Sequence, residues 1–144
     1  MNSPDCPQFG DCLPDTIYRL RPGAYALIFR GDGCLAVMRT PLGHYLPGGG
    51  IERDEDDLTA LHRELLEECG WQIRIGDYLA EAMQYTRSPA GNGYAKASRF
   101  YKAEFIAEIA DPTEPDHEVR WLSVREAVQE LKLESQRWVV EQMR

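Results

Sequence analysis

A segment without glycine or proline, residues 54–69, stands between the three glycines at 48–50 and Gly70. Its apolar residues recur at spacings of three and four, the period of a helix with one buried face; they are Leu58, Leu61, Leu65 and Cys69. Glycine adopts the left-handed conformation that ends many helices, so Gly70 marks a stop. The sequence therefore predicts a helix over residues 54–69 that packs against a core, with Cys69 as a small buried side chain.

The same helix carries a cluster of carboxylates beside its apolar stripe. Glu64, Glu67 and Glu68 stand at i, i+3 and i+4, displaced from the stripe by about a third of a turn at roughly 100° per residue. Like charges at this spacing repel, so we expect a positive partner. Mg²⁺ prefers carboxylate and phosphate oxygens and takes few protein ligands. The pattern favours a metal site, and the alternative is a solvated acidic face.

The residues before the helix form a glycine-rich loop. Tyr45 and Leu46 begin a short apolar strand that ends in Pro47 and the glycines at 48–50. Glycines permit a sharp turn or a close approach of the backbone to a ligand. We expect this loop to lie beside the carboxylates, with Gly49 and Gly50 against the substrate.

Residues 49–71, GGIERDEDDLTALHRELLEECGW, resemble the Nudix box, the signature of the Nudix hydrolase family. The resemblance holds at each specified position, namely Gly49, Glu55, Arg63, Glu64, Leu65, Glu67, Glu68, Gly70 and Trp71. It implies an α/β fold, an α/β/α sandwich with a mixed β-sheet. It also implies a hydrolase that uses Mg²⁺, or Mn²⁺ in its place, to cleave a diphosphate linked to another moiety, usually a nucleoside.

The resemblance assigns roles within this segment. The metal ligands it implies are Glu64, Glu67, Glu68 and a backbone carbonyl near Gly48. Arg63 would act in catalysis by orienting a neighbouring glutamate. Glu64 would either complete the metal shell or take the proton of the attacking water, and both roles stay open. Glu55 and Gly70 are further positions of the box.

A further acid or base is expected beyond the box, where family members often carry a loop glutamate. Glu114 and Glu118 are the candidates, and Glu118 is preferred because it opens the segment that enters the last strand. Solvated loop carboxylates are the alternative. His44, His62 and His117 stand in no recognised spacing, although histidine titrates near neutral pH.

Substrate contacts outside the box are predicted from residue type and position. Arg39 ends a strand where family members often carry a basic residue that faces the phosphates, with a plain surface arginine as the alternative. Tyr85 is a candidate for stacking on a base, as are Tyr94, Phe100 and Tyr101, although aromatic residues on strands more often pack. Tyr45 is expected to pack beneath the glycine loop.

The rest of the chain alternates between strand and helix patterns. Residues 1–16 predict an irregular lead-in and residues 17–144 a single domain. Strands are expected at 23–29, 34–39, 71–85, 97–109 and 119–122, the first two as a hairpin around Arg30-Gly31-Asp32-Gly33 and the third bent at Gly76-Asp77. Residues 88–93 and 111–117 predict loops. Ser123 and Glu126 form a capping-box pattern, and a last helix is expected at 134–143 with Trp138, Val139 and Met143 inward.

The net charge and the lack of long apolar runs limit which kinds of molecule the protein is expected to bind. The net charge of −8 argues against a general nucleic-acid surface, which needs basic patches. No apolar run approaches the roughly 18 residues of a membrane span, and the N-terminus lacks a signal-peptide pattern. We expect a cytoplasmic protein with a small nucleotide substrate, no nucleic acid and no membrane. A homodimer stays open, and the four cysteines are expected to be reduced thiols.

Three functions fit these features. The first is a pyrophosphohydrolase of nucleoside triphosphates, including oxidised deoxynucleotides, that releases a monophosphate and pyrophosphate. The second is an ADP-ribose or other nucleotide-sugar pyrophosphatase; the proline that marks this group after the box is missing or shifted, since Pro89 follows Thr86 and Arg87. The third is a Nudix module that senses a nucleotide without hydrolysis, but such modules typically lose box glutamates that this chain keeps.

Overall fold

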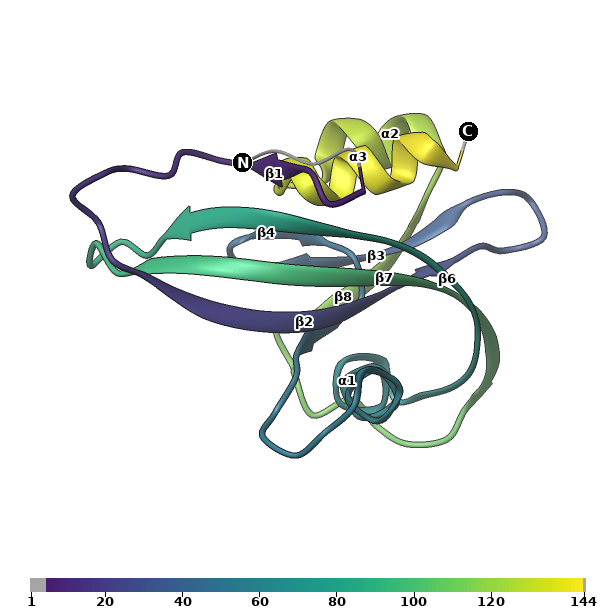
Figure 1. Cartoon of the computed structure of the whole chain (residues 1–144). Helices are drawn as coiled ribbons and strands as arrows, with labels where there is room; N and C mark the ends of the chain where they lie inside the picture. Colours follow the sequence, from purple (N-terminus) through teal and green to yellow (C-terminus); the bar gives the residue numbers. More distant parts are fainter. Residues whose placement is uncertain (1–4, 144) are drawn as a thin grey trace.

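A computed structural model describes residues 5–143. Two β-sheets lie between helix α1 (Asp57–Cys69) on one side and helices α2 (Val124–Glu130) and α3 (Glu134–Gln142) on the other (Figure 1). The strands of the larger sheet are β1 (Gln8–Phe9), β2 (Tyr18–Ile28), β5 (Gly48–Gly50), β6 (Trp71–Arg87) and β7 (Gly93–Glu108). Those of the smaller sheet are β3 (Leu35–Thr40), β4 (Gly43–Tyr45) and β8 (Glu118–Leu122). The α/β/α sandwich expected from the sequence is confirmed.

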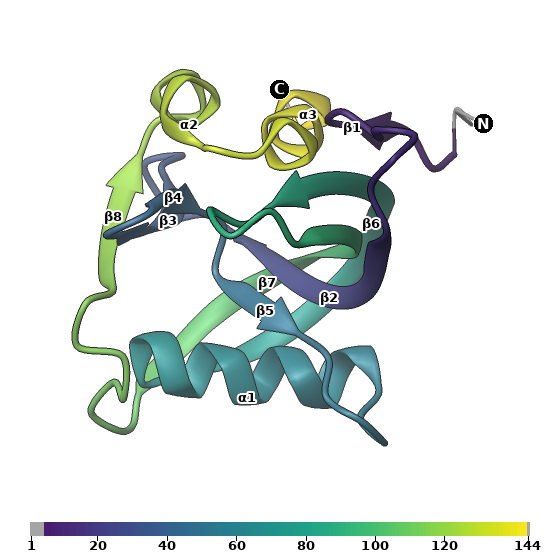
Figure 2. The same cartoon turned by 90° about the vertical axis from the view of Figure 1, so that its left-hand side faces the viewer.

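The larger sheet is mixed, with the strand order β1-β6-β7-β2-β5. β6 and β7 form a long antiparallel hairpin, β2 runs parallel to β7, and β5 runs antiparallel to β2. The smaller sheet has the order β4-β3-β8 and is antiparallel. Viewed at right angles, the two sheets diverge from the region where β2 and β3 meet (Figure 2). This arrangement brings β5 to the edge of the larger sheet, over α1.

Two apolar cores cover the two faces of the sheets. Ala24, Ala26 and Ile28 of β2 point to α1, whereas Leu27 points to the core under α2 and α3. Because side chains alternate along a strand, β2 is buried on both faces. Strand β3 behaves in the same way, which explains why both strands read as continuous apolar runs.

The prediction of a hairpin between residues 23–29 and 34–39 is correct only for the turn, because the two strands do not pair beyond it. The turn forms, since Gly33 N donates to Arg30 O at 2.9 Å and a single bridge joins Phe29 to Leu35. The two strands then separate into different sheets. The edges of β2 are occupied by β7 and β5, and those of β3 by β4 and β8. Local turn residues predict a reversal of the chain, but they do not determine which strand pairs with which.

The N-terminal lead-in also differs from the expectation. Gln8 and Phe9 form β1, which pairs in parallel with Met83 and Gln84 of β6. Between residues 5 and 16 the remaining backbone is irregular, as predicted, and the first four residues of that lead-in lie outside the described part of the chain. Phe9 packs against Trp138 of α3 with ring centroids 5.9 Å apart. Tertiary contacts with the C-terminal helix thus order a segment without sequence periodicity.

The other expected elements form, with shifted ends. β6 carries register shifts on both sides of Tyr78, which is the bend predicted at Gly76-Asp77. Ser123 and Glu126 make both hydrogen bonds of the capping box that begins α2. Helix α3 buries Val139 as expected and also Val140. The helix of the box starts at Asp57 rather than near Asp54, with Asp56 as its N-cap, and Leu58 is exposed although the pattern placed it on the buried stripe.

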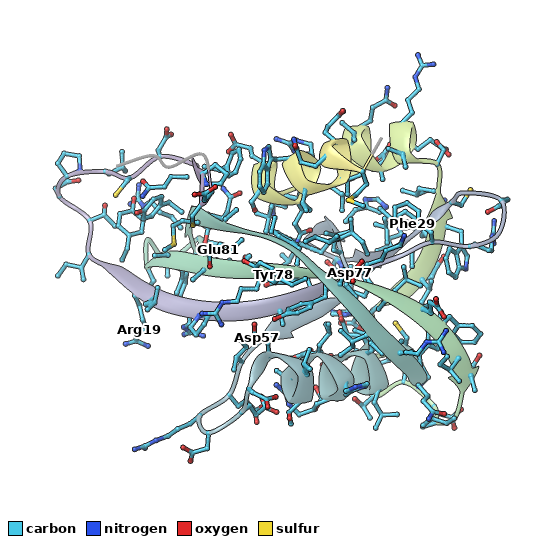
Figure 3. All side chains as sticks on the ribbon, turned by 45° about the vertical axis from the view of Figure 1, so that its right-hand side comes forward. Arg19, Phe29, Asp57, Asp77, Tyr78 and Glu81 are labelled. Carbon is cyan, nitrogen blue, oxygen red and sulfur yellow. The ribbon has the colours of Figure 1, made fainter. Side chains whose placement is uncertain are left out.

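The first turn of α1 is tied to the larger sheet by charged and aromatic side chains. Asp57 accepts hydrogen bonds from Arg99 Nη1 and Tyr101 Oη, each at 2.7 Å. Arg99 also lies 3.9 Å from Glu81, and the Tyr101 ring contacts Tyr78 edge-on. Figure 3 shows Asp57 at the start of α1 with Tyr78 and Glu81 on the strand above it. These contacts fix the start of α1 against β6 and β7.

No helix within residues 5–143 has both the length and the apolar character needed to cross a membrane.

Candidate active site

The glycine loop and helix α1 meet at a contact that only glycine permits. A Cβ on Gly49 would lie 2.5 Å from the carboxyl carbon of Glu64. Gly48 has φ of 138°, and a Cβ there would lie 2.2 Å from the carbonyl oxygen of Ala24. The backbone of β5 therefore passes directly over the carboxylates of α1, as the sequence predicted.

Glu68 is a buried carboxylate held by the loop. Its Oε1 accepts a hydrogen bond from Gly48 N at 2.8 Å, and its side chain is 9% exposed. Burial raises the pKa of Glu68 to about 8, aided by the negative charges of Glu64, Glu114 and Glu67 and opposed by the Gly48 hydrogen bond. A raised pKa indicates a carboxylate that lacks a full positive partner.

Arg63 is the cation nearest to this cluster. Its Nε and Nη2 donate to the two oxygens of Glu55 at 2.7 and 2.9 Å, and Nη2 also donates to Gly50 O at 3.0 Å. Its Nη1 lies 3.1 Å from Glu64 and 3.3 Å from Glu67. The Arg63 hydrogen bonds hold the pKa of Glu55 at about 2. The arrangement joins the loop, Glu55 and the helix carboxylates through one guanidinium.

The contact with Arg63 does not fully compensate the negative charge of Glu64. Burial raises its pKa to about 6, the Arg63 charge and hydrogen bond oppose that shift, and the charges of Glu67 and Glu114 add to it. Glu67 is more exposed than Glu64 and Glu68. Of the three carboxylates expected to share one face of α1, Glu64 and Glu67 thus meet at Arg63, whereas Glu68 is turned to the Gly48 amide.

A divalent cation fits the chemistry of these residues. Within the described part of the chain, no three acidic, cysteine or histidine side chains already converge as a metal-binding group. Glu64 and Glu67 are turned to Arg63, and Glu68 to the Gly48 amide. Yet the donors are hard oxygens, the pKa values of Glu64 and Glu68 are raised, and Mg²⁺ needs only one or two protein carboxylates besides substrate phosphates and water.

The loop before β8 brings two more titratable side chains to the cluster. Thr113 N donates to Glu67 O at 2.8 Å and so anchors the loop to α1. His117 Nδ1 then lies 3.2 Å from Glu68 Oε2, and the charge of Glu114 acts on both Glu64 and Glu68. The sequence offered Glu114 as an alternative, and it assigned no place to His117.

The structure does not bring Glu118, the preferred acid or base, to the carboxylates. Glu118 is the register partner of Arg39 in the smaller sheet, next to the pair Val119 and Met38. Met38 and Val119 face α1, so Glu118 and Arg39 face the opposite side, because neighbouring residues of a strand alternate. Glu118 is next to Val119 in the sequence, but alternation along the strand places its side chain on the opposite face of the sheet.

Arg39 consequently lies away from the loop and the carboxylates. It lines a hollow of about 360 Å³ on the α2 side together with His44, Glu126 and Glu130. The prediction that Arg39 faces the phosphates of the substrate is not supported by this placement.

A groove of about 660 Å³ begins at the end of the glycine loop. Gly50 is one of its lining residues, and the aromatic ones are Tyr25, Tyr45 and Tyr94. Tyr25 packs under the loop, since its ring lies 3.0 Å from where a Gly48 Cβ would be. Burial and the charges of Glu68 and Glu64 raise the pKa of Tyr25 to about 12. The groove therefore borders the carboxylate cluster, through Gly50, whose O accepts from Arg63, and through Tyr25.

The other aromatic candidates lie elsewhere. Tyr85 lines a separate hollow beside the N-terminal segment and packs edge-on against Tyr18. Phe100 is fully buried in the core under α2 and α3, and Tyr101 donates to Asp57. Of the four candidates for base stacking, only Tyr94 lines the groove.

The fold and this cluster of carboxylates define a class of hydrolase, and comparison with known proteins gives the family. A model of the NUDIX domain matches residues 19–142, so the chain belongs to the Nudix family and is a Nudix hydrolase. Members of this family generally need a divalent metal. A comparison with curated protein sequences gave no match.

Solved structures agree with this assignment. A MutT NUDIX hydrolase from Burkholderia pseudomallei is 29% identical with a TM-score of 0.66, over 88% of this chain and 99% of that one. The E. coli ORF135 protein is 26% identical with a TM-score of 0.64, over 86% and 88% of the two chains. A MutT protein from Methanosarcina mazei Go1 shares the fold, with a TM-score of 0.69 at 20% identity over 87% and 93%.

Proposed function

We propose that this chain is a metal-dependent pyrophosphohydrolase of nucleoside triphosphates, including oxidised deoxynucleotides, and releases a nucleoside monophosphate and pyrophosphate. The observation that carries the proposal is that Gly50 lines the aromatic groove and also accepts a hydrogen bond from Arg63, which contacts Glu64 and Glu67 of α1. When the diphosphate of a nucleotide lies at the carboxylates, its nucleoside can enter the groove. The Burkholderia pseudomallei relative, which is named a MutT NUDIX hydrolase, supports the same class.

In this proposal Glu64, Glu67 and Glu68, with a backbone carbonyl near Gly48, hold Mg²⁺ or Mn²⁺. When bound, the cation supplies Lewis acidity and offsets negative charge on the diphosphate. Arg63 orients Glu64 and Glu67 while it holds the loop through Gly50 O. Glu64 either completes the ligand set or accepts a proton from the attacking water. Gly49 and Gly50 let the backbone lie close to the phosphates.

Glu114 replaces Glu118 as the loop carboxylate of this mechanism. The charge of Glu114 acts on Glu64 and Glu68, whereas Glu118 lies on the other face of the smaller sheet. A proton acceptor must come within hydrogen-bond reach of its substrate. We assign this role to Glu114 because it follows Thr113, which anchors the loop to α1, and His117 beside Glu68 helps to set the orientation of that carboxylate.

A nucleotide-sugar pyrophosphatase is the second candidate. It would use the same carboxylates and place a sugar rather than pyrophosphate on the far side of the scissile bond. A UDP-X diphosphatase has the same fold, at 17% identity with a TM-score of 0.62. The two candidates differ in product, because only the first releases pyrophosphate.

The test is a panel of nucleoside triphosphates, oxidised deoxynucleoside triphosphates and nucleotide sugars with Mg²⁺ or Mn²⁺, with each product identified by chromatography. Glu67→Gln should lower kcat by about 100-fold or more, because it removes a charged ligand rather than a core contact. Glu118→Gln is the matched control and should stay near wild type. The proposal fails if nucleotide sugars alone are cleaved, or if Glu67→Gln keeps full turnover at saturating metal.

A further inference from the structure

The groove beside the active site is basic although the chain as a whole is acidic. Four cations line it, Arg21, Arg87, Lys96 and Lys132, and none of its described lining residues is aspartate or glutamate. The whole chain carries a net charge of −8. Positive side chains that gather in one hollow of an acidic protein concentrate anions there.

Three of these cations lie close together without an acidic partner. Arg21 of β2 and Lys96 of β7 are register partners on neighbouring strands, and the Arg21 guanidinium lies over the Tyr94 ring at 4.9 Å. Lys132 is held at the groove by a 3.0 Å hydrogen bond from its Nζ to Leu42 O. In the part of the chain that the structure describes, no carboxylate lies within ion-pair distance of the three.

The charged form of Lys96 is disfavoured by its place among these cations. It is half-buried in the sheet, and burial lowers its pKa, with the positive charges of Lys132 and Arg21 adding to the effect. A buried cation normally has a partner, because removing its charge from water is costly. Here the neighbours increase the repulsion, so a bound anion would stabilise all three side chains.

The cations are also separate from the carboxylates that define the cleavage site. Glu64, Glu67 and Glu68 do not line the groove, and Arg21 stands two residues further along β2 than Gly23, the register partner of Gly50. A diphosphate at Glu64 and Glu68 therefore leaves Arg21, Lys96 and Lys132 for another part of the same molecule. Tyr25, Tyr45 and Tyr94 offer flat apolar surface in the same groove.

We propose that the groove binds a phosphate group of the substrate that is distinct from the diphosphate to be cleaved. The inference rests on the proposed hydrolase function and narrows its substrate class to nucleotides that carry a second phosphorylated position. A neutral base would offer carbonyl acceptors to Lys and Arg, but it would leave the repulsion among the three cations in place. A phosphate group offers both acceptors and the opposite charge.

The first experiment measures binding without catalysis. Metal-free protein in EDTA is titrated with inorganic pyrophosphate by calorimetry, so the carboxylates of α1 contribute no metal site. Lys96→Met should weaken binding about tenfold, the value of one charge-assisted hydrogen bond. Lys102→Met is the matched control, since Lys102 is an exposed lysine on the same strand outside the groove, and its affinity should equal that of wild type.

The second experiment measures turnover with Mg²⁺ for a nucleoside 5′-triphosphate and for the same compound with an added 2′- or 3′-phosphate. The wild-type KM should be about tenfold lower for a phosphorylated form, and Lys96→Met should remove that preference while Lys102→Met keeps it. Equal KM values for all forms, or pyrophosphate binding that is indifferent to Lys96, would overturn the inference. If no nucleotide is hydrolysed, the proposed function fails, while the metal-free titration still decides whether the groove takes a phosphate group.

Discussion

The buried carboxylate of Glu68 lowers the stability of the metal-free fold when it is ionised. The carboxyl group is buried beside Glu64 and close enough to Glu114 for their charges to act on it. One backbone amide and one histidine nitrogen lie within reach of its oxygens. An ionised carboxylate in such a place needs positive charge, because burial in a low dielectric penalises the charged form. The folded chain therefore favours either protonation of Glu68 or the arrival of a cation.

This conflict predicts how the stability of the metal-free protein depends on pH. The folded-state pKa of Glu68 is raised from 4.5 to about 8, so the folded protein binds a proton more tightly than the unfolded chain does. The resulting stabilisation is fully present below pH 4.5 and is lost as the pH rises through about 8. We expect the Tm in EDTA to fall from pH 5 to pH 9, as measured by circular dichroism.

Two variants separate Glu68 from the general charge of the protein in this experiment. Glu68→Gln should flatten the fall of Tm between pH 5 and pH 9, since the amide does not ionise. Glu118→Gln should keep the slope of wild type, because its carboxylate is exposed on the other face of the smaller sheet. Millimolar Mg²⁺ should raise the Tm at pH 9 and have little effect at pH 5. Identical slopes for Glu68→Gln and wild type would contradict this account.

At the scale of an element, α1 is defined by its ends as much as by its amphipathic pattern. Asp56 accepts a hydrogen bond from Thr59 N at the start, and Asp57 fixes the first turn to β7. At the other end Gly70 has φ of 71° and its N–H donates to the last turn. Gly70 O then accepts from Ile109 N at 2.8 Å. Gly70 therefore ends the helix and also forms a hydrogen bond with the end of the segment that leads into the loop of Glu114 and His117.

Substitution of Gly70 tests this double role. A Cβ there would lie 1.9 Å from Ala110 O in a left-handed conformation, so Gly70→Ala should cost about 3 kcal/mol or more of unfolding free energy from strain and overlap together. Gly33→Ala is the control, because Gly33 has φ of 86° but no heavy atom within 4 Å of a Cβ; it should cost about 1 kcal/mol. Urea denaturation measures both. Equal losses in the two variants would show that the contact with Ala110 is unimportant.

In the molecule as a whole, two buried glutamines join α3 to the larger sheet and to the segment before the glycine loop. Gln84 of β6 accepts a hydrogen bond from Ser135 N at 2.9 Å, and Gln136 of α3 accepts one from Leu46 N at 2.8 Å. Leu46 lies between β4 and the glycine loop. The position of that loop over α1 therefore depends on a helix on the opposite side of the molecule.

Gln136→Met should destabilise the fold by about 1–3 kcal/mol, because it leaves the buried Leu46 N–H without a partner. Methionine keeps the length of the side chain, so the effect reports the hydrogen bond rather than a cavity. Gln142→Met, on the exposed part of the same helix, should stay within about 0.5 kcal/mol of wild type. Hydrogen exchange read at Leu46 should rise in Gln136→Met alone. A Gln136→Met variant as stable as wild type would rule out this link.

Helix α1, its carboxylate face and several local features could be predicted from the sequence alone. The periodicity of residues 58–69 and the stop at Gly70 predicted α1, and the spacing of Glu64, Glu67 and Glu68 predicted their shared face, because both follow from helical geometry alone. The capping box at Ser123 and the bend of β6 were likewise correct, since hydrogen bonds and residue types within a few positions decide them.

Contacts between residues far apart in the chain could not be predicted in this way. The divergence of β2 and β3 depends on which edges β7 and β8 occupy, and turn residues carry no information about that choice. Register in the smaller sheet directs Glu118 and Arg39 away from α1, because a shift of one position reverses the face of a strand. His117, Glu114 and the cations of the groove reach the site through pairings between segments far apart in the chain, and local patterns do not encode such pairings.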